Sequence, residues 1–162
     1  MRNLLNAESI ASSRVFPETP WRERIERAAG AVFAKLPSRR IAAVSSRAAR
    51  YGDLTAVIGL SGAIFGSLSV RCSWAAAGNF ARGMLGVPEP TKEQIQITLG
   101  ELAHRIARTM GKEAAGPARE CLIEAPIVFG HASADGDPLA KSCLVAFEFQ
   151  GFPVWIRFSI YD

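Results

Sequence analysis

Apolar residues recur at helical spacing over one long stretch of the chain, from Thr91 to Lys112. Pro90 blocks a helix before this stretch, and Thr91 followed by Gln94 has the spacing of a capping box. The pattern predicts an amphipathic helix with a well-defined start. Steps of four and three residues place one apolar stripe on the side that faces a core, and its members are Ile95, Leu99, Leu102, Ile106 and Met110.

Two further helices are predicted earlier in the chain. Thr19 as a cap and Pro20 at the first helical position begin a helix that keeps its apolar spacing until Pro37. Ser73 is placed to cap a shorter helix, which Gly86 ends. The residues of this shorter helix predicted to face inward are Ala77, Phe80, Ala81, Met84 and Leu85.

Alternating apolar and polar positions predict two antiparallel hairpins. Residues 54–60 and 64–70 alternate on either side of Ser61-Gly62. Residues 143–149 and 152–160 alternate on either side of Gln150-Gly151. Each hairpin is expected to have one buried face.

Two weaker strand patterns complete the order of elements. One spans residues 41–50; the other spans 122–129, where Pro126 removes a ladder donor and places the strand at an edge or a bulge. The order of helix, three strands, two helices and three strands predicts an α+β fold. We expect an antiparallel sheet of about six strands with two long amphipathic helices packed on one face. A chain of 162 residues fits one domain, expected at 19–162, with residues 1–18 as an N-terminal arm.

Charge and cysteine content narrow the class of protein. Nineteen basic and fifteen acidic residues give a net charge of +4, which favours an acidic partner, and no nucleic-acid-binding motif accompanies the basic residues. The three cysteines are odd in number and far apart, which predicts free thiols in a reducing cytoplasm. No run of about 18 apolar residues is present, so no membrane span is predicted.

The outer face of the 91–112 helix carries the candidate chemistry. Glu101 and His104 lie roughly 60° apart on a helical wheel, opposite the apolar stripe. Arg105 and Arg108 share this face, together with Ile97, which the buried stripe does not need. An acid and an imidazole are therefore expected side by side, with an apolar residue and two cations around them.

A strip of small residues runs along the same helix. It consists of Gly100, Ala107 and Gly111. Glycine inside a helix costs about 1 kcal/mol relative to alanine. A packing or binding reason is therefore expected, such as the close approach of another backbone.

The residues alone leave several interpretations of Glu101 and His104 open. The pair can be an incidental feature of a solvated helix face. A metal site using His104 and His131, the latter near Asp135 and Asp137, is a second interpretation. A di-iron site needs two Glu-x-x-His motifs, and the chain has one.

Four short segments, in order, resemble the CheC/CheX/FliY group of chemotaxis phosphatases, and most closely its CheX branch. They are VIGLSGAIFG at 57–66, MLG at 84–86, GELA at 100–103 and APIVFG at 125–130. They resemble the family's first hairpin, the end of its next helix, its active-site helix and the strand after it. The resemblance covers the chain from about Trp21 to its last residue.

The resemblance implies an activity and a partner. The family speeds hydrolysis of the aspartyl phosphate on a CheY-like receiver domain, often as a homodimer joined through sheet contacts. A glutamate of the active-site helix contacts a receiver lysine, an asparagine three residues later orients water, and the receiver holds the magnesium. Glu101 matches the acid, but His104 stands at the asparagine position and Arg108 where a small residue is usual. The resemblance implies no cofactor bound by this chain itself.

Two functional hypotheses follow from this departure. Neutral imidazole has one donor and one acceptor on opposite ring edges, so His104 can orient or deprotonate water, and general-base assistance is worth about 10²–10⁴-fold. In the first hypothesis the chain is a phosphatase with Glu101 and His104 as catalytic residues and Ile97, Arg105 and Arg108 binding the receiver. In the second it is an impaired module that binds the receiver without dephosphorylating it.

Overall fold

The computed structural model describes residues 18–36, 41–44, 54–130 and 141–161. Within these ranges the chain forms three helices, which are α1 (Glu18–Ala34), α2 (Trp74–Leu85) and α3 (Lys92–Ala115). Helix α1 begins one residue before the predicted cap, so Thr19 and Pro20 lie in its first turn. Residues 1–17 of the predicted N-terminal arm lie outside the described residues.

Helix α3 has the predicted capping box. The Gln94 N–H donates to Thr91 Oγ1 at 3.2 Å, and the Thr91 N–H donates to Gln94 Oε1 at 2.9 Å. These bonds satisfy amide groups that a helix leaves free at its first turn. The helix runs three residues beyond the predicted Lys112 and stops at Gly116, whose φ is +70°.

The described strands form one antiparallel sheet. They are β1 (Ile41–Val44), β2 (Leu54–Gly62), β3 (Gly66–Cys72), β4 (Cys121–Ile123), β5 (Ile127–Gly130), β6 (Lys141–Phe149) and β7 (Phe152–Ile160). Their order is β1-β6-β7-β3-β2, and β4 and β5 both pair with the outer edge of β2. The sheet thus has six strand positions, as predicted. Pro126 lies in the break between β4 and β5, which confirms the edge position predicted for it.

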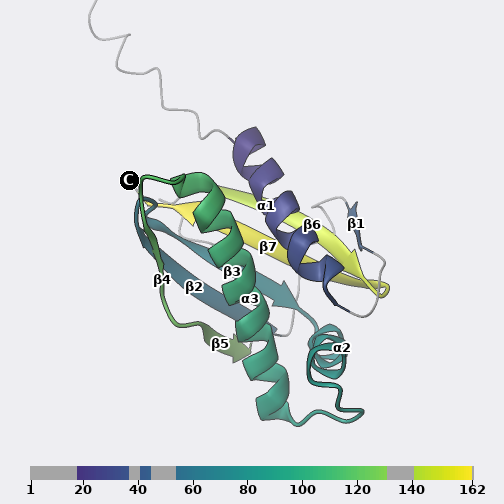
Figure 1. The fold of residues 1–162 in the computed structure, drawn as a ribbon. Helices are drawn as coiled ribbons and strands as arrows, with labels where there is room; N and C mark the ends of the chain where they lie inside the picture. Colours follow the sequence, from purple (N-terminus) through teal and green to yellow (C-terminus); the bar gives the residue numbers. More distant parts are fainter. Residues whose placement is uncertain (1–17, 37–40, 45–53, 131–140, 162) are drawn as a thin grey trace, which may run out of the picture.

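Helices α1 and α3 lie across the same face of this sheet, and α2 lies beside the lower half of α3 in the view of Figure 1. The core between helices and sheet contains the predicted stripe of α3, in which Leu99, Leu102, Ile106 and Met110 are fully buried. Alternate residues of β2 and β3 face the same core. The predicted α+β architecture is therefore confirmed.

Local sequence sets the turns that the core requires. The β6–β7 turn has positive φ at both central residues, +51° at Gln150 and +81° at Gly151. A two-residue hairpin turn needs these angles if its twist is to match the twist of the two strands. Ser73 caps α2 by accepting from the Ala76 N–H at 3.1 Å. One inward prediction is wrong: Leu85, at the last position of α2, is exposed.

Candidate functional site on helix α3

The outer face of α3 has the composition predicted from the helical wheel. Ile97 is 63% exposed, although its side chain is apolar. Glu101, Arg105 and Arg108 are exposed and His104 is half-buried, while the neighbouring Leu102 and Ala103 are buried. The structure therefore brings together on one surface all five residues that the sequence analysis selected.

Glu101 forms an ion pair on this surface. Arg105 Nε donates to Glu101 Oε1 at 2.9 Å, and the two side chains are 48% and 49% exposed. An exposed pair spaced four residues apart on a helix contributes about 0.3–0.5 kcal/mol. Such a pair orients the Glu101 carboxylate. Because the pair is weak, another cation can displace Arg105 at a small cost in free energy. The spacing of the two residues contains this signal, but the sequence analysis placed them on one face without pairing them.

His104 has no bonded side-chain partner among the described residues. Among the described residues its imidazole forms no hydrogen bond or ion pair, and it makes none with Glu101. The two residues therefore share a face without forming a hydrogen-bonded dyad. No described side chain therefore occupies the ring nitrogens of His104, each of which can donate or accept one hydrogen bond.

A groove of about 350 Å³ runs beside Glu101, between α3 and β5. We call it the α3–β5 groove; its lining residues are Gln96, Ile97, Gly100, Glu101, Pro126 and Val128. The Glu101 carboxylate thus lies at the rim of the largely apolar α3–β5 groove. The far wall, Pro126 and Val128, was not predicted as part of the site, because only the folded sheet brings it to α3.

The strip of small residues on α3 has a packing role. A methyl group at Gly100 would lie 3.1 Å from Pro126 Cγ and 3.3 Å from Val128 Cγ2. A methyl group at Gly111 would lie 3.1 Å from Cys121 Sγ. All three distances are shorter than a usual van der Waals contact of about 3.5–4.0 Å. Glycine therefore lets α3 lie directly against the β4–β5 edge, which confirms the expected packing reason.

The described residues contain no group of three or more His, Cys, Asp and Glu side chains that could hold a metal ion. The metal-site interpretation also used His131, which lies outside the described residues. None of the three cysteines, all of which lie in the described ranges, forms a disulfide, and Cys72 and Cys143 are buried. No helix in the described ranges is long and apolar enough to cross a membrane.

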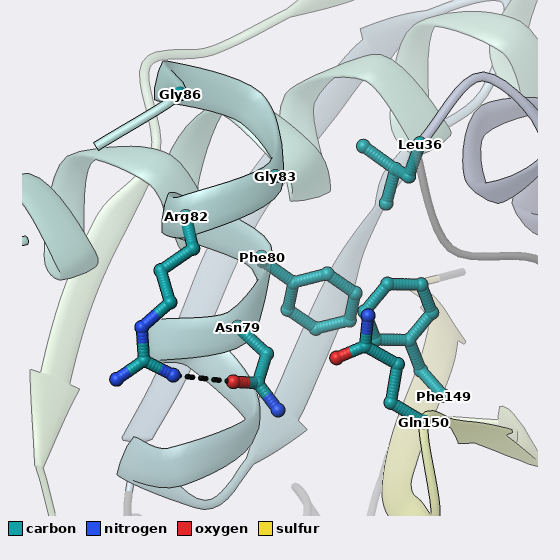
Figure 2. Close-up of a pocket in the computed structure, with 8 residues that line it drawn as sticks. All are labelled: Leu36, Asn79, Phe80, Arg82, Gly83, Gly86, Phe149 and Gln150. Atoms are coloured by element: carbon teal, nitrogen blue, oxygen red, sulfur yellow. Dashed lines mark hydrogen bonds between the residues drawn. The ribbon is translucent and has the colours of Figure 1, made fainter. Parts of the chain in front are cut away.

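A second hollow, of about 400 Å³, lies beside α2 and contains no residue of α3. Figure 2 shows the Phe80 and Phe149 rings side by side within it, with centroids 4.3 Å apart. Arg82 Nη1 donates to Asn79 Oδ1 at 2.7 Å, and Arg82 Nε donates to the Pro88 carbonyl oxygen at 3.0 Å. Arg82 and Asn79 thus bind each other, and Arg82 also ties α2 to the loop that follows. The outer face of α3 is therefore kept as the candidate site.

Solved structures with the same arrangement of helices and sheet include CheX proteins. Chemotaxis protein CheX from Vibrio vulnificus matches with a TM-score of 0.72 and 17% identity, over 87% of this chain and 96% of that one. This chain has the CheX fold. CheX from Desulfovibrio desulfuricans matches with a TM-score of 0.68 and 16% identity, over 88% of this chain and 99% of that one.

A third CheX structure was determined with its partner. A chain of the CheX–CheY–BeF₃–Mg²⁺ complex from Borrelia burgdorferi matches with a TM-score of 0.68 and 17% identity, over 86% of this chain and 97% of that one. No protein-family model and no curated protein match this sequence. The resemblance read from the sequence is therefore confirmed as a likeness of fold to CheX.

Proposed function

We propose that this chain docks the outer face of α3 on the phosphorylated receiver domain of a CheY-like response regulator and accelerates hydrolysis of its aspartyl phosphate. The CheX fold supports this proposal, since CheX of Borrelia burgdorferi forms a complex with CheY. The single observation that carries it is the exposed Glu101 carboxylate, held at the rim of the α3–β5 groove beside an unpaired His104. Chemotaxis or two-component signalling is the setting that follows from this partner.

In the proposed complex Glu101 exchanges Arg105 for a lysine of the receiver. The Glu101–Arg105 pair is exposed, so breaking it costs only about 0.3–0.5 kcal/mol. The released Arg105 remains one turn away and can bind a phosphate oxygen or a receiver carboxylate. The new ion pair would fix the position of α3 relative to the phosphorylated aspartate.

His104 then acts on the attacking water. The water oxygen attacks phosphorus in line with the aspartyl oxygen, the bond between phosphorus and that oxygen breaks, and the products are the free carboxylate and inorganic phosphate. A neutral imidazole nitrogen accepts a hydrogen bond from the water and can take its proton. Positioning is the main demand of phosphoryl transfer, so holding this water is the proposed contribution of His104.

Ile97, Arg105 and Arg108 form the proposed docking rim. Ile97 contributes apolar area that docking would remove from water, and the two arginines add positive charge. We assign the magnesium ion to the receiver, so the chain needs no metal ligands of its own. We further propose that the chain works in the cytoplasm and forms a homodimer. The exposed apolar residues Leu122, Ile127 and Phe129 on the β4–β5 edge support the homodimer.

The test is the decay of a phosphorylated CheY-like receiver with and without the chain. We expect faster decay with the wild-type protein and a return towards the intrinsic rate with Glu101→Ala. Glu120→Ala is the matched control, because it removes an exposed carboxylate from the turn before β4. No acceleration at saturating wild-type protein would show that the enzyme proposal is wrong. Full activity of Glu101→Ala would instead show that the site is wrong.

The second hypothesis, a module that binds without hydrolysis, is favoured by one observation. His104 replaces the amide that the resemblance expects, and an imidazole presents its donor and acceptor in different directions. His104→Asn separates the two hypotheses. If imidazole impairs the site, His104→Asn gains activity over the wild type; if His104 works as proposed, His104→Ala loses activity and His104→Asn does not exceed the wild type.

A further inference from the structure

A groove of about 360 Å³ lies between α1 and α3, on the side of Glu101 away from the α3–β5 groove. We call it the basic groove; its lining residues are Val32, Lys35, Arg105, Arg108, Thr109 and Lys112. Four of these six side chains are cations and none is a carboxylate. Lys35 and Lys112 were not selected from the sequence, because they are 77 positions apart by number (112 minus 35) and meet only when α1 packs on α3.

Most of this positive charge is unpaired. Arg105 is bonded to Glu101, whereas Lys35, Arg108 and Lys112 form no ion pair among the described residues. The nearby Glu113 is already bound to Arg27 across the two helices, at 3.0 Å from Arg27 Nε. Like charges spaced four residues apart, as Arg108 and Lys112 are, weaken a helix. Three exposed cations without an internal partner leave the groove positively charged, which favours an anionic partner.

The lining of the groove favours an acidic protein surface over nucleic acid. No aromatic side chain lines it, so it offers no platform on which bases could stack. Its cations are exposed at the ends of long side chains, which suits a broad acidic surface better than one enclosed small anion. The groove is also continuous with the proposed site, because Arg105 and Arg108 follow Glu101 and His104 by one helical turn each.

We infer that the basic groove binds an acidic surface of the same receiver domain whose aspartyl phosphate is presented to Glu101 and His104, with Lys35 and Lys112 as recognition residues. The inference rests on the proposed function. It adds α1 to the docking surface. It also makes receiver association dependent on charges that take no part in the hydrolysis itself.

The test measures the association rate of the chain with CheY-like receivers loaded with beryllofluoride and magnesium, by biolayer interferometry. The variant is Lys35→Glu/Lys112→Glu. Lys92→Glu/Arg119→Glu is the control with the same change in net charge: both residues are exposed, and Lys92 lies roughly 180° around α3 from Glu101. Rates are compared at about 0.01 M and about 0.15 M ionic strength, where charges are screened beyond about 30 Å and 8 Å.

We expect the groove variant to associate about tenfold more slowly at the lower ionic strength. The difference should shrink at the higher ionic strength, and the control should slow much less than the groove variant. Lys35→Gln/Lys112→Gln should show a smaller change in the same direction, which keeps the test valid if the charge reversal disturbs folding. Unfolding midpoints of all variants check that the fold is retained.

Four results would overturn the inference. Equal association of the groove variant and the wild type leaves the proposed function standing and removes the groove from it. Equal slowing by the groove variant and the control would mean that only net charge matters. Binding of single-stranded DNA by the wild type, lost in the groove variant while receiver association is unchanged, would assign the groove to nucleic acid. If the wild type binds no receiver in the panel, both the proposed function and this inference fail.

Discussion

Replacing Gly100 with alanine adds one methyl group at the tight contact between α3 and the β4–β5 edge. The new carbon would lie 3.1 Å from Pro126 Cγ, 3.3 Å from Pro126 Cβ and 3.3 Å from Val128 Cγ2. Because a normal contact needs about 3.5–4.0 Å, the proline ring and Val128 would have to move by a few tenths of an ångström. Gly30 in α1 is the matched control, since a methyl group there has no atom within 4 Å.

The expected magnitudes follow from two opposing effects. Alanine is favoured over glycine in a helix by about 1 kcal/mol, and both variants gain this amount. Overpacking costs about 1–3 kcal/mol and applies to Gly100→Ala alone. Gly30→Ala should therefore stabilise the protein by about 1 kcal/mol. Gly100→Ala should be neutral or destabilising by up to about 2 kcal/mol.

Thermal unfolding measures the difference. For a chain of this size about 1 kcal/mol moves Tm by about 2–4 °C, so Gly30→Ala should raise Tm by that amount. Gly100→Ala should leave Tm unchanged or lower it by several degrees. If Gly100→Ala raises Tm as much as Gly30→Ala does, α3 is not held against β5 as described and the wall of the α3–β5 groove is wrong.

Three further predictions concern other parts of the fold. Thr91→Ala should lower the unfolding free energy by about 1 kcal/mol in denaturant titration, because the Gln94 N–H loses its acceptor; an unchanged value would contradict the capping box. Phe80→Ala should cost about 3–5 kcal/mol in the same assay, because the buried ring stacks on Phe149; a loss below about 1 kcal/mol would contradict this packing. Burial raises the pKa of the Cys121 thiol, so less thiolate is present at each pH than for a free cysteine. Iodoacetamide should therefore alkylate Cys121 more slowly than it alkylates the thiol of glutathione, and the rate at Cys121 should rise with pH. Peptide mass spectrometry measures this rate. Alkylation of Cys121 as fast as that of glutathione would contradict the prediction.

Local signals in the sequence predicted most of the fold. The capping box at Thr91 and Gln94 and the stripe of α3 depend on residues a few positions apart, so the sequence contains them directly. The hairpin around Gln150-Gly151 is local for the same reason. The strand order is different: β3 pairs with β7, and β1 pairs with β6, across long stretches of chain. Pairings of this kind depend on packing of the whole domain and were not predicted.

Some residues of the candidate site could likewise be predicted from the sequence, and others could not. Its α3 residues could be placed from the helical period alone, and the exposed Ile97 stood out because the buried stripe did not need it. Pro126, Val128 and Lys35 come from other elements, so only the folded structure brings them to α3. The catalytic roles of Glu101 and His104 remain predictions, because the likeness to CheX concerns the fold.

The most direct test is methyl NMR of the isoleucine- and leucine-labelled chain titrated with a beryllofluoride-loaded CheY-like receiver. Ile97 is 63% exposed on the proposed docking face, whereas Leu85, 47% exposed, ends α2 and serves as the control. We predict that the Ile97 methyl signal shifts with receiver concentration, that the Leu85 signals do not, and that Glu101→Ala weakens the titration. Binding that shifts Leu85 and leaves Ile97 unchanged, or no binding to any receiver tested, would contradict the assignment of α3 as the receiver-binding surface.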